Sequence, residues 1–574
     1  MDASSPGSPT DASSLTDASS PTDPGRPRTP ALDLIRTVVD PGSWSCWDEP
    51  VGVTTDDPAY RADLLAARER TGLDESVVTG EGRVRGRRVA VVACEFRFLA
   101  GSIGVAAGER LVRAVERATA ERLPLLAAPA SGGTRMQEGT VAFLQMVKVA
   151  AAITDHKAAG LPYLVHLRHP TTGGVLASWG SLGHLTSAEP GALIGFLGPR
   201  VHEALYGEEF PPGVQLAENL LAHGLVDAVL TAEQLPGTVG RALAVLCDDR
   251  SDDRRSGGRS DVRPMAATPA VVPAVVPSAA ESIRRSRDPE RPGVRELLDA
   301  AATDVTLLSG TGAGERDPGL LLALARVGGT PCVVLGHDRG SRHDEGSTAG
   351  STGATGTAGA PGVPAAGQAL GPAGLRAARR GMRIAAELGL PLLTVVDTAG
   401  AALSREAEEG GLAGEIARCL ADLVTLPAPT LCLLLGQGAG GAALALLPAD
   451  RVVAARHAWL SPLPPEGASA ILYRTTDRAD EVAARQGVRS ADLLAHGIVD
   501  LVVEEPDAGA VSPAPPVAPA SAAASALQAP SATDDFLPRL GALLGAEMTA
   551  LGAREQGERL ADRRARYRRI GLGS

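Results

Sequence analysis

The residue types best suited to chemistry in this sequence are glycines that follow apolar, strand-like runs. The first group is Ser131-Gly132-Gly133, which lies between the apolar run 123–128 and a helical pattern, with Arg135 close behind. A strand that enters a helix through glycines presents bare backbone N–H groups at the positive end of the helix. Such a place suits a phosphate, a carboxylate or a developing oxyanion, although the same residues also form ordinary turns. Arg135 is the best-placed cation for an anionic substrate, and an exposed helix arginine is the alternative.

Two further glycine pairs, Gly173-Gly174 and Gly440-Gly441, each follow a strand-like segment and precede a helix-like one. Consecutive N–H groups at such a junction can point at one oxygen, which is the arrangement of an oxyanion hole. Taken singly, each pair could equally reflect close packing. Their matching positions in the two halves of the chain indicate one duplicated fold that offers two anion-stabilising pockets.

The duplication is visible as three sequence blocks that return in the same order. The first two blocks return after 267 residues and the third after 273. The matching blocks are 123–126 with 390–393, 173–177 with 440–444, and 222–227 with 495–500. The period is far above solenoid lengths, so it indicates two whole domains rather than a repeat array.

Side-chain candidates for nucleophilic or acid–base chemistry are few. The sequence has no G-x-S-x-G elbow, and no identifiable His–Asp pair accompanies Ser131. Glu138 and Glu466 could act as bases, but both lie at turns or helix starts, where carboxylates are favoured in any case. His223 and His496 occupy matching repeat positions near helix ends, where a capping role is the default. The pattern therefore predicts backbone donors without a catalytic side chain, which suits a reaction whose substrate or cofactor supplies its own base.

Composition narrows the classes of function. With 574 residues the chain is too long for one core, and its net charge of −12 argues against broad binding to nucleic acid or anionic membranes. The six cysteines are scattered without a C-x-x-C pair, which predicts a reduced cytoplasmic protein with neither a disulfide framework nor a zinc ribbon. No uncharged apolar run approaches the roughly 20 residues of a membrane helix. Neither Lys148 nor Lys157 lies in a phosphate-binding P-loop.

Shifts in composition divide the chain into two domains joined by polar or low-complexity segments. We expect a disordered leader at 1–30, an N-terminal domain at 31–247, a linker at 248–280, a C-terminal domain at 281–505 with a low-complexity insert at 341–366, a linker at 506–533 and a basic helical tail at 534–574. For the arginine-rich end of the tail, a solvated helix is the preferred interpretation. The alternatives are that it folds back on an acidic surface, or that it binds a partner or an anion.

Several motifs resemble the carboxyltransferase subunits of bacterial acetyl-CoA carboxylase. The β-subunit-like motifs are Gly101-Ser102-Ile103-Gly104, Ser131-Gly132-Gly133-Thr134-Arg135-Met136-Gln137-Glu138-Gly139, Gly173-Gly174-Val175 and Ala188-Glu189-Pro190-Gly191-Ala192-Leu193-Ile194-Gly195-Phe196. The α-subunit-like motifs are Asp288-Pro289-Glu290-Arg291-Pro292, Asp397-Thr398-Ala399-Gly400, Gly438-Ala439-Gly440-Gly441-Ala442 and Pro465-Glu466-Gly467-Ala468-Ser469. The order, β-like and then α-like in one chain, is similar to the fused acyl-CoA carboxylase carboxyltransferases of high-GC bacteria.

The resemblance implies an α/β fold of two tandem crotonase-like (ClpP-like) β-β-α superhelix domains. It further implies transfer of CO₂ from carboxybiotin to the α-carbon of acetyl-CoA, which gives malonyl-CoA. On this resemblance Ser131, Gly132, Gly133 and Arg135 would bind the acyl-CoA and its carboxylated product. Gly173-Gly174 would stabilise the thioester enolate, and Gly440-Gly441-Ala442 would stabilise the biotin oxyanion.

The resemblance also implies the partners. Biotin would arrive on a carrier protein that works with a biotin carboxylase, and the chain itself would form a homo-oligomer, a dimer or larger, in the cytoplasm. Two positions depart from the family pattern: Ala399 replaces a proline and Pro464 replaces a serine. The zinc ribbon of the β subunit is absent, so no metal is predicted.

Other functions remain as alternatives. They are a carboxyltransferase for propionyl-CoA or another acyl-CoA, a biotin-dependent acyl-CoA decarboxylase, and a non-catalytic paralogue that assembles with an active subunit. A simple hydratase or isomerase is disfavoured, because it would need paired carboxylates beside the glycine sites.

Overall fold

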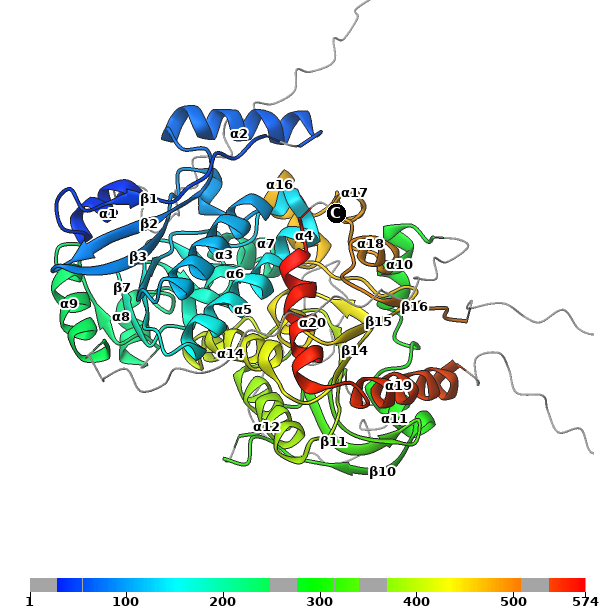
Figure 1. The fold of residues 1–574 in the computed structure, drawn as a ribbon. Helices are drawn as coiled ribbons and strands as arrows, with labels where there is room; N and C mark the ends of the chain where they lie inside the picture. The colour runs from blue at the N-terminus through cyan, green and yellow to red at the C-terminus, as the bar shows by residue number, and fades with distance from the viewer. Residues whose placement is uncertain are drawn as a thin grey trace, which may run out of the picture.

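The computed structural model describes residues 28–53, 55–223, 225–247, 276–313, 315–339, 369–506 and 536–572. The described chain forms two seven-stranded sheets, one from each half of the sequence, with helices packed around them (Figure 1). Most of the expected leader, most of both linkers and the whole low-complexity insert lie outside the described residues.

Both sheets add their strands in the order in which the chain makes them. The first sheet runs β1 (Ser45–Cys46), β2 (Val77–Val84), β3 (Arg87–Cys94), β4 (Leu125–Ala128), β5 (Tyr163–Leu167), β7 (Leu185–Ala188) and β9 (Ala228–Val229). The second runs β10 (Ala302–Leu307), β11 (Leu320–Val327), β12 (Thr330–His337), β13 (Leu392–Thr398), β14 (Thr430–Gly438), β15 (Arg451–Ala455) and β16 (Leu501–Val503). Each sheet begins with antiparallel pairs and continues parallel from its third strand onward.

Helices connect the parallel strands, as β-α-β crossovers require, and further helices precede or follow them along the chain. In the first half they are α1 (Ala31–Val38), α2 (Pro58–Thr71), α3 (Val105–Ala120), α4 (Gly139–Phe143), α5 (Gln145–Ala158), α6 (Gly173–Leu176), α7 (Pro199–Tyr206), α8 (Ala217–Ala222) and α9 (Leu235–Leu246). In the second they are α10 (Ala279–Ser286), α11 (Val294–Ala301), α12 (Pro372–Leu388), α13 (Arg405–Glu409), α14 (Leu412–Thr425), α15 (Gly440–Leu446), α16 (Pro465–Tyr473), α17 (Ala479–Arg485) and α18 (Ser490–Ala495).

The two halves repeat each other in backbone detail, which confirms the duplicated α/β fold class. A β-bridge joins Ile103 to Thr134 in the first half, and the bridge Leu370 to Ala401 lies 267 residues further on. Helices α3 and α12 begin at the same relative place, because Gly104 and Gly371 are their N-terminal flanking residues. The equivalent strands β4 and β13 of the two sheets are fully buried, as expected where helices cover both faces of a parallel sheet.

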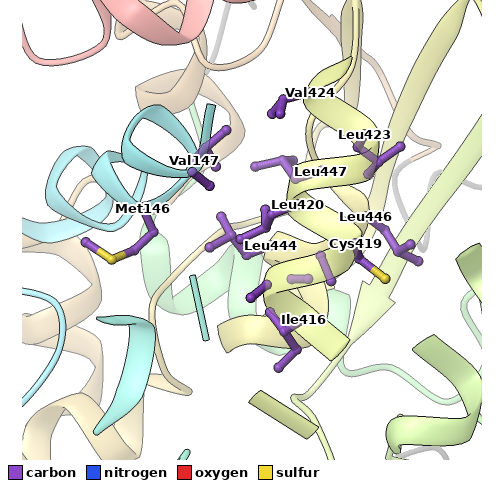
Figure 2. Close-up of a cluster of buried hydrophobic side chains, with 14 of the residues drawn as sticks. Met146, Val147, Ile416, Cys419, Leu420, Leu423, Val424, Leu444, Leu446 and Leu447 are labelled. Carbon is purple, nitrogen blue, oxygen red and sulfur yellow. The ribbon is translucent and has the colours of Figure 1, made fainter. Parts of the chain in front are cut away.

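One hydrophobic core runs through both halves. Helix α5 of the first half packs against α14 of the second (Figure 2). Val147 of α5 faces Leu420 of α14 and Leu444 of α15 in this core, and all three side chains are buried. The helix that begins at the second glycine pair is therefore fixed by the first half of the chain as well as by its own.

The basic tail forms two helices, α19 (Phe536–Gly552) and α20 (Gln556–Arg569), and α20 lies across both halves (Figure 1). Arg563 is fully buried and pairs with Asp450 of the second half at 2.8 Å. Arg568 pairs with Glu109 of the first half at 2.5 Å. The preferred interpretation of this segment as a solvated helix is therefore wrong, and folding back onto an acidic surface is what the structure shows.

Candidate active site

The Ser131-Gly132-Gly133 turn follows β4 and is held on both sides by backbone hydrogen bonds. The Ser131 N–H donates to Pro170 O at 2.7 Å, and the Thr172 N–H donates to Ser131 O at 2.9 Å. The buried Ser131 hydroxyl accepts the Gly133 N–H at 3.0 Å, so it closes the turn rather than facing a substrate. The turn is thus a rigid platform beside β6 (Thr171–Thr172).

Gly173 and Gly174 begin α6 directly opposite this turn, and their two amides differ. Gly173 has a φ of +64°, and its N–H donates to Phe196 O at 2.9 Å. Gly174 lies in the first turn of α6, where a backbone N–H has no partner within the helix. A Cβ added to Gly133, whose φ is +105°, would lie only 3.3 Å from Gly174 N. The bare Cα of Gly133 therefore keeps the space beside the Gly174 amide open.

The second half builds the same arrangement from different residues. The Ala439 N–H donates to Thr398 O at 3.1 Å, and the N–H of Gly440, with a φ of +63°, donates to Ser461 O at 2.9 Å. Thr398 and Gly400 thus correspond to Ser131 and Gly133, again at an offset of 267. This correspondence was missed in the sequence, because Thr-Ala-Gly does not look like Ser-Gly-Gly. The constant offset of the two glycine pairs was the signal that could have found it.

The two sites differ in access. Gly173 and Gly174 are partly exposed, whereas Gly440, Gly441 and Ala442 are buried. A Cβ added to Gly441 would lie 2.7 Å from the Phe196 ring and 2.8 Å from Ile416 Cδ1. The first site is therefore open to a ligand, and the second is covered by a side chain from the first half.

Arg135 lies behind the first site, and its placement corrects the expectation of a cation that contacts the substrate. Its side chain is 1% exposed and donates to both carboxylate oxygens of Glu75, at 2.5 and 2.9 Å, and to Ser102 O at 2.8 Å. Burial alone would lower the pKa of Arg135, but the Glu75 carboxylate outweighs it and holds this pKa above its usual value. Arg135 is neither an exposed helix arginine nor a free cation. It anchors the loop that carries Gly133.

A buried ion pair supports the second site in a similar way. Asp397, which precedes the Thr398 turn, is fully buried and pairs with Arg291 at 2.6 Å. The same carboxylate accepts the Gln437 N–H at 3.1 Å, which ties it to the end of β14. Ala399 follows Thr398 at the position that corresponds to Gly132. Pro464 is the residue before α16, and Pro465 occupies the first helical position, where the fixed φ of proline suits the start of a helix.

The carboxylates and histidines considered from the sequence have structural partners. Glu138 accepts the Val105 N–H at 2.6 Å at the start of α3, and Glu466 pairs with Arg287 at 2.7 Å. Burial would raise the pKa of Glu466, but the Arg287 guanidinium outweighs it and lowers this pKa, which makes Glu466 a poor base near neutral pH. His223 and His496 are the C-terminal flanking residues of α8 and α18, as expected, and His223 Nδ1 lies 2.9 Å from Asn219 O at the end of α8.

The described residues form neither a cluster of metal ligands nor a membrane span. Within them, no group of three or more His, Cys, Asp or Glu side chains could hold a metal ion. No helix formed by these residues is both long and apolar enough to span a membrane.

Fold and site together define a tandem α/β protein in which each half presents backbone amides at a glycine-opened helix start. The model of the carboxyl transferase domain family matches residues 28–513, and the chain belongs to this family. It is 57% identical over 540 residues to a probable biotin-dependent acyl-coenzyme A carboxylase beta3 subunit of Mycobacterium tuberculosis, covering 94% of this chain and 98% of that protein. It is 39% identical over 485 residues to the acetyl-coenzyme A carboxylase carboxyl transferase subunits beta/alpha of Salinispora arenicola, covering 83% of each. Among solved structures, the beta subunit of geranyl-CoA carboxylase from P. aeruginosa aligns with 92% of this chain and 88% of that one, at 16% identity and a TM-score of 0.32.

Proposed function

We propose that the chain is the carboxyltransferase component of a biotin-dependent acyl-CoA carboxylase, with acetyl-CoA as the substrate to test first. The observation that carries the proposal is the open Gly174 amide, which faces the side-chain-free Gly133 in the domain that resembles the β subunit. Membership of the carboxyl transferase family and the names of the two relatives support it.

In the proposed reaction the α-carbon of the thioester loses a proton and forms a bond to CO₂, while the bond between CO₂ and a biotin nitrogen breaks. The carboxylated biotin of a carrier protein supplies both the CO₂ and the basic urea group. The part played by the first site is electrostatic: the Gly174 N–H donates to the thioester oxygen as negative charge develops there. Gly173 contributes differently from our expectation, because its N–H holds Phe196 O and fixes the turn instead.

The second site supplies the Gly441 and Ala442 amides at the start of α15 as donors for the urea oxygen of biotin. Its backbone reproduces the first site, and the Gly440 N–H is again committed to a carbonyl. The donor set fits a urea oxygen that gains negative charge as the CO₂ leaves, because backbone amides donate hydrogen bonds to such an oxygen. Because the Phe196 ring lies against Gly441, use of this site requires the ring to move aside.

The surroundings of Gly174 favour a short acyl group. A Cβ at this position would lie 3.2 Å from both Met146 Cγ and Thr134 Oγ1, so these two side chains border the space that the bare Gly133 Cα leaves open. We propose acetyl-CoA ahead of propionyl-CoA on this ground, with malonyl-CoA as the product. Assembly with a biotin carboxylase and a biotin carboxyl carrier protein, and a homo-oligomeric state, remain predictions.

The test is a carboxyl-transfer assay with the biotinylated partner that co-purifies with the chain. Acetyl-, propionyl- and butyryl-CoA are offered in turn, and the carboxylated product is followed by mass spectrometry. The proposal expects turnover that is fastest with acetyl-CoA. Turnover with a longer substrate alone would overturn the choice of acetyl-CoA, and no turnover with any of the three would overturn the carboxyltransferase assignment.

A further inference from the structure

Glu408 of α13 reaches from the second half of the chain into the loop that supports the first site. Its carboxylate accepts the Phe196 N–H at 2.7 Å and the Leu197 N–H at 3.3 Å. It also accepts Gln215 Nε2 at 2.8 Å, and the same nitrogen donates to Leu197 O at 2.8 Å. All these donors are neutral groups of the first half, so this carboxylate acts as a hydrogen-bond acceptor for them.

Phe196 is the residue through which Glu408 can affect both sites. Its carbonyl oxygen accepts the Gly173 N–H at 2.9 Å, which sets the start of α6 and hence the direction of the next amide. Its ring lies against Gly441 at the second site. One residue, held by one carboxylate, thus contacts both glycine pairs. The carboxylate itself follows the Gly400 turn of the second site by only eight residues.

Burial raises the pKa of Glu408, although the hydrogen bonds from Gln215, Phe196 and Leu197 oppose this shift. A carboxylate placed where burial disfavours its charge is costly unless several donors satisfy it. The loop 196–197 and Gln215 supply those donors. Burying the Glu408 carboxylate against this loop therefore costs free energy that a contact between the two halves at the surface would not cost.

We propose that Glu408 is a positioning residue for the carboxyltransferase reaction: by holding the Phe196–Leu197 backbone, it sets the geometry of the Gly174 amide and the cover over Gly441. The inference rests on the proposed function for its kinetic readout only. The contact with Phe196 and Leu197 is testable in the full-length chain without any substrate.

The kinetic test compares Glu408→Ala with Glu409→Ala in the full-length chain with its biotinylated partner. Glu409 is the matched control, because it lies beside Glu408 and also reaches the first half, through Asn219 at 3.3 Å, but does not contact the 196–197 loop. Glu408→Ala is expected to lower kcat at least tenfold, with less than a threefold change in KM for acyl-CoA, since the donor geometry matters most as charge develops. Glu409→Ala is expected to match the wild type.

Glu408→Gln separates positioning from charge. Its amide oxygen can still accept from Phe196 and Gln215, so we expect it to regain most of the kcat lost in Glu408→Ala. Equal loss in the alanine and glutamine variants would overturn positioning by hydrogen bonds. Should Glu408→Ala fail to fold, Gln215→Met serves in its place. It removes the donor that bridges Glu408 and Leu197, and an unchanged kcat in this variant would also contradict the proposal.

Amide hydrogen exchange provides a readout that does not depend on activity. The amides of Phe196 and Leu197 are expected to exchange faster in Glu408→Ala than in the wild type or in Glu409→Ala. Unchanged exchange would overturn the inference whatever the kinetics. If the wild type shows no carboxyl transfer but this difference in exchange is present, the proposed function fails while the structural contact stands.

Discussion

Gly133→Ala is the sharpest single test of the first site, because it adds one methyl group where the structure leaves room for a ligand oxygen. The added Cβ would lie 3.3 Å from Gly174 N and 3.4 Å from Thr172 O. A substrate oxygen that accepts the Gly174 N–H must approach that nitrogen to about 2.9 Å. A methyl group at this distance crowds the same small space.

Two effects of this substitution can be separated by magnitude. Alanine at a φ of +105° strains the backbone by about 1–3 kcal/mol, which lowers stability without any direct effect on chemistry. Loss of one oxyanion donor lowers kcat by about 10²–10³, equivalent to about 2.7–4 kcal/mol of transition-state stabilisation. We therefore expect a kcat about a hundredfold lower than that of the wild type, measured on protein that is fully folded at the assay temperature.

Gly86→Ala is the matched control for the backbone cost. Gly86 lies in the β2–β3 hairpin with a φ of +81°, and an added Cβ there would meet nothing within 4 Å. Both variants are assayed for acyl-CoA carboxylation and for free energy of unfolding by urea titration. Equal kcat values in the two variants, at similar losses of stability, would refute the assignment of Gly174 as the oxyanion donor.

Three further predictions concern the second site, the tail and acid stability. Gly441→Val should abolish turnover by pushing against the Phe196 ring, 2.7 Å from the added Cβ, and a variant that retains full turnover would remove the second oxyanion site from the mechanism. Arg563→Met should lower the free energy of unfolding in urea titration by about 3–5 kcal/mol, because the buried carboxylate of Asp450 loses this cation. As the control, Arg569→Met at an exposed position should lower it by less than about 0.5 kcal/mol. Burial lowers the pKa of His166 to about 3, so below pH 6.5 the unfolded chain binds a proton there that the folded chain does not. Protonation of His166 in the unfolded chain should therefore lower the free energy of unfolding by about 2 kcal/mol between pH 6.5 and pH 5. In urea titrations over the same pH range, His166→Gln should show a correspondingly smaller fall than the wild type.

The parts of the structure that depend on local pattern could be predicted from the sequence. The glycine pairs, the repeat and the buried parallel strands leave their mark in residues that are close along the chain. The spacing of Phe143, Met146 and Val147 indicates the helical pattern after the first glycine group, and these side chains are all buried, although the structure divides the segment into α4 and α5. Each of these predictions needed only the period of the hydrophobic pattern and the chemistry of turns.

The parts that could not be predicted depend on partners far away in the sequence. The ionic contacts of the tail helix join Arg563 to Asp450 and Arg568 to Glu109, and no local pattern pairs such residues. The role of Arg135 likewise depends on Glu75, sixty residues earlier, whose carboxylate offers two acceptors inside the core. A charge run or a lone arginine suggests a solvated or ligand-binding side chain until its buried partner is known.

Duplication explains why, in each half, the amide of the first glycine is structural and that of the second has no partner within its helix. The first glycine of each pair must adopt a positive φ and donate to the neighbouring strand segment, as Gly173 and Gly440 both do. That hydrogen bond fixes the start of the helix, and the next amide is then directed by the fold instead of by any side chain. The two copies have since become unequal, because Phe196 of the first half covers Gly441 while Gly174 stays open. The proposed reaction, with two substrates of different shape, would need this inequality, since two identical pockets could not distinguish a flexible thioester from a rigid bicyclic urea. The contact between Phe196 and Gly441 is therefore the place where the specificity of the two sites should be separable by mutation.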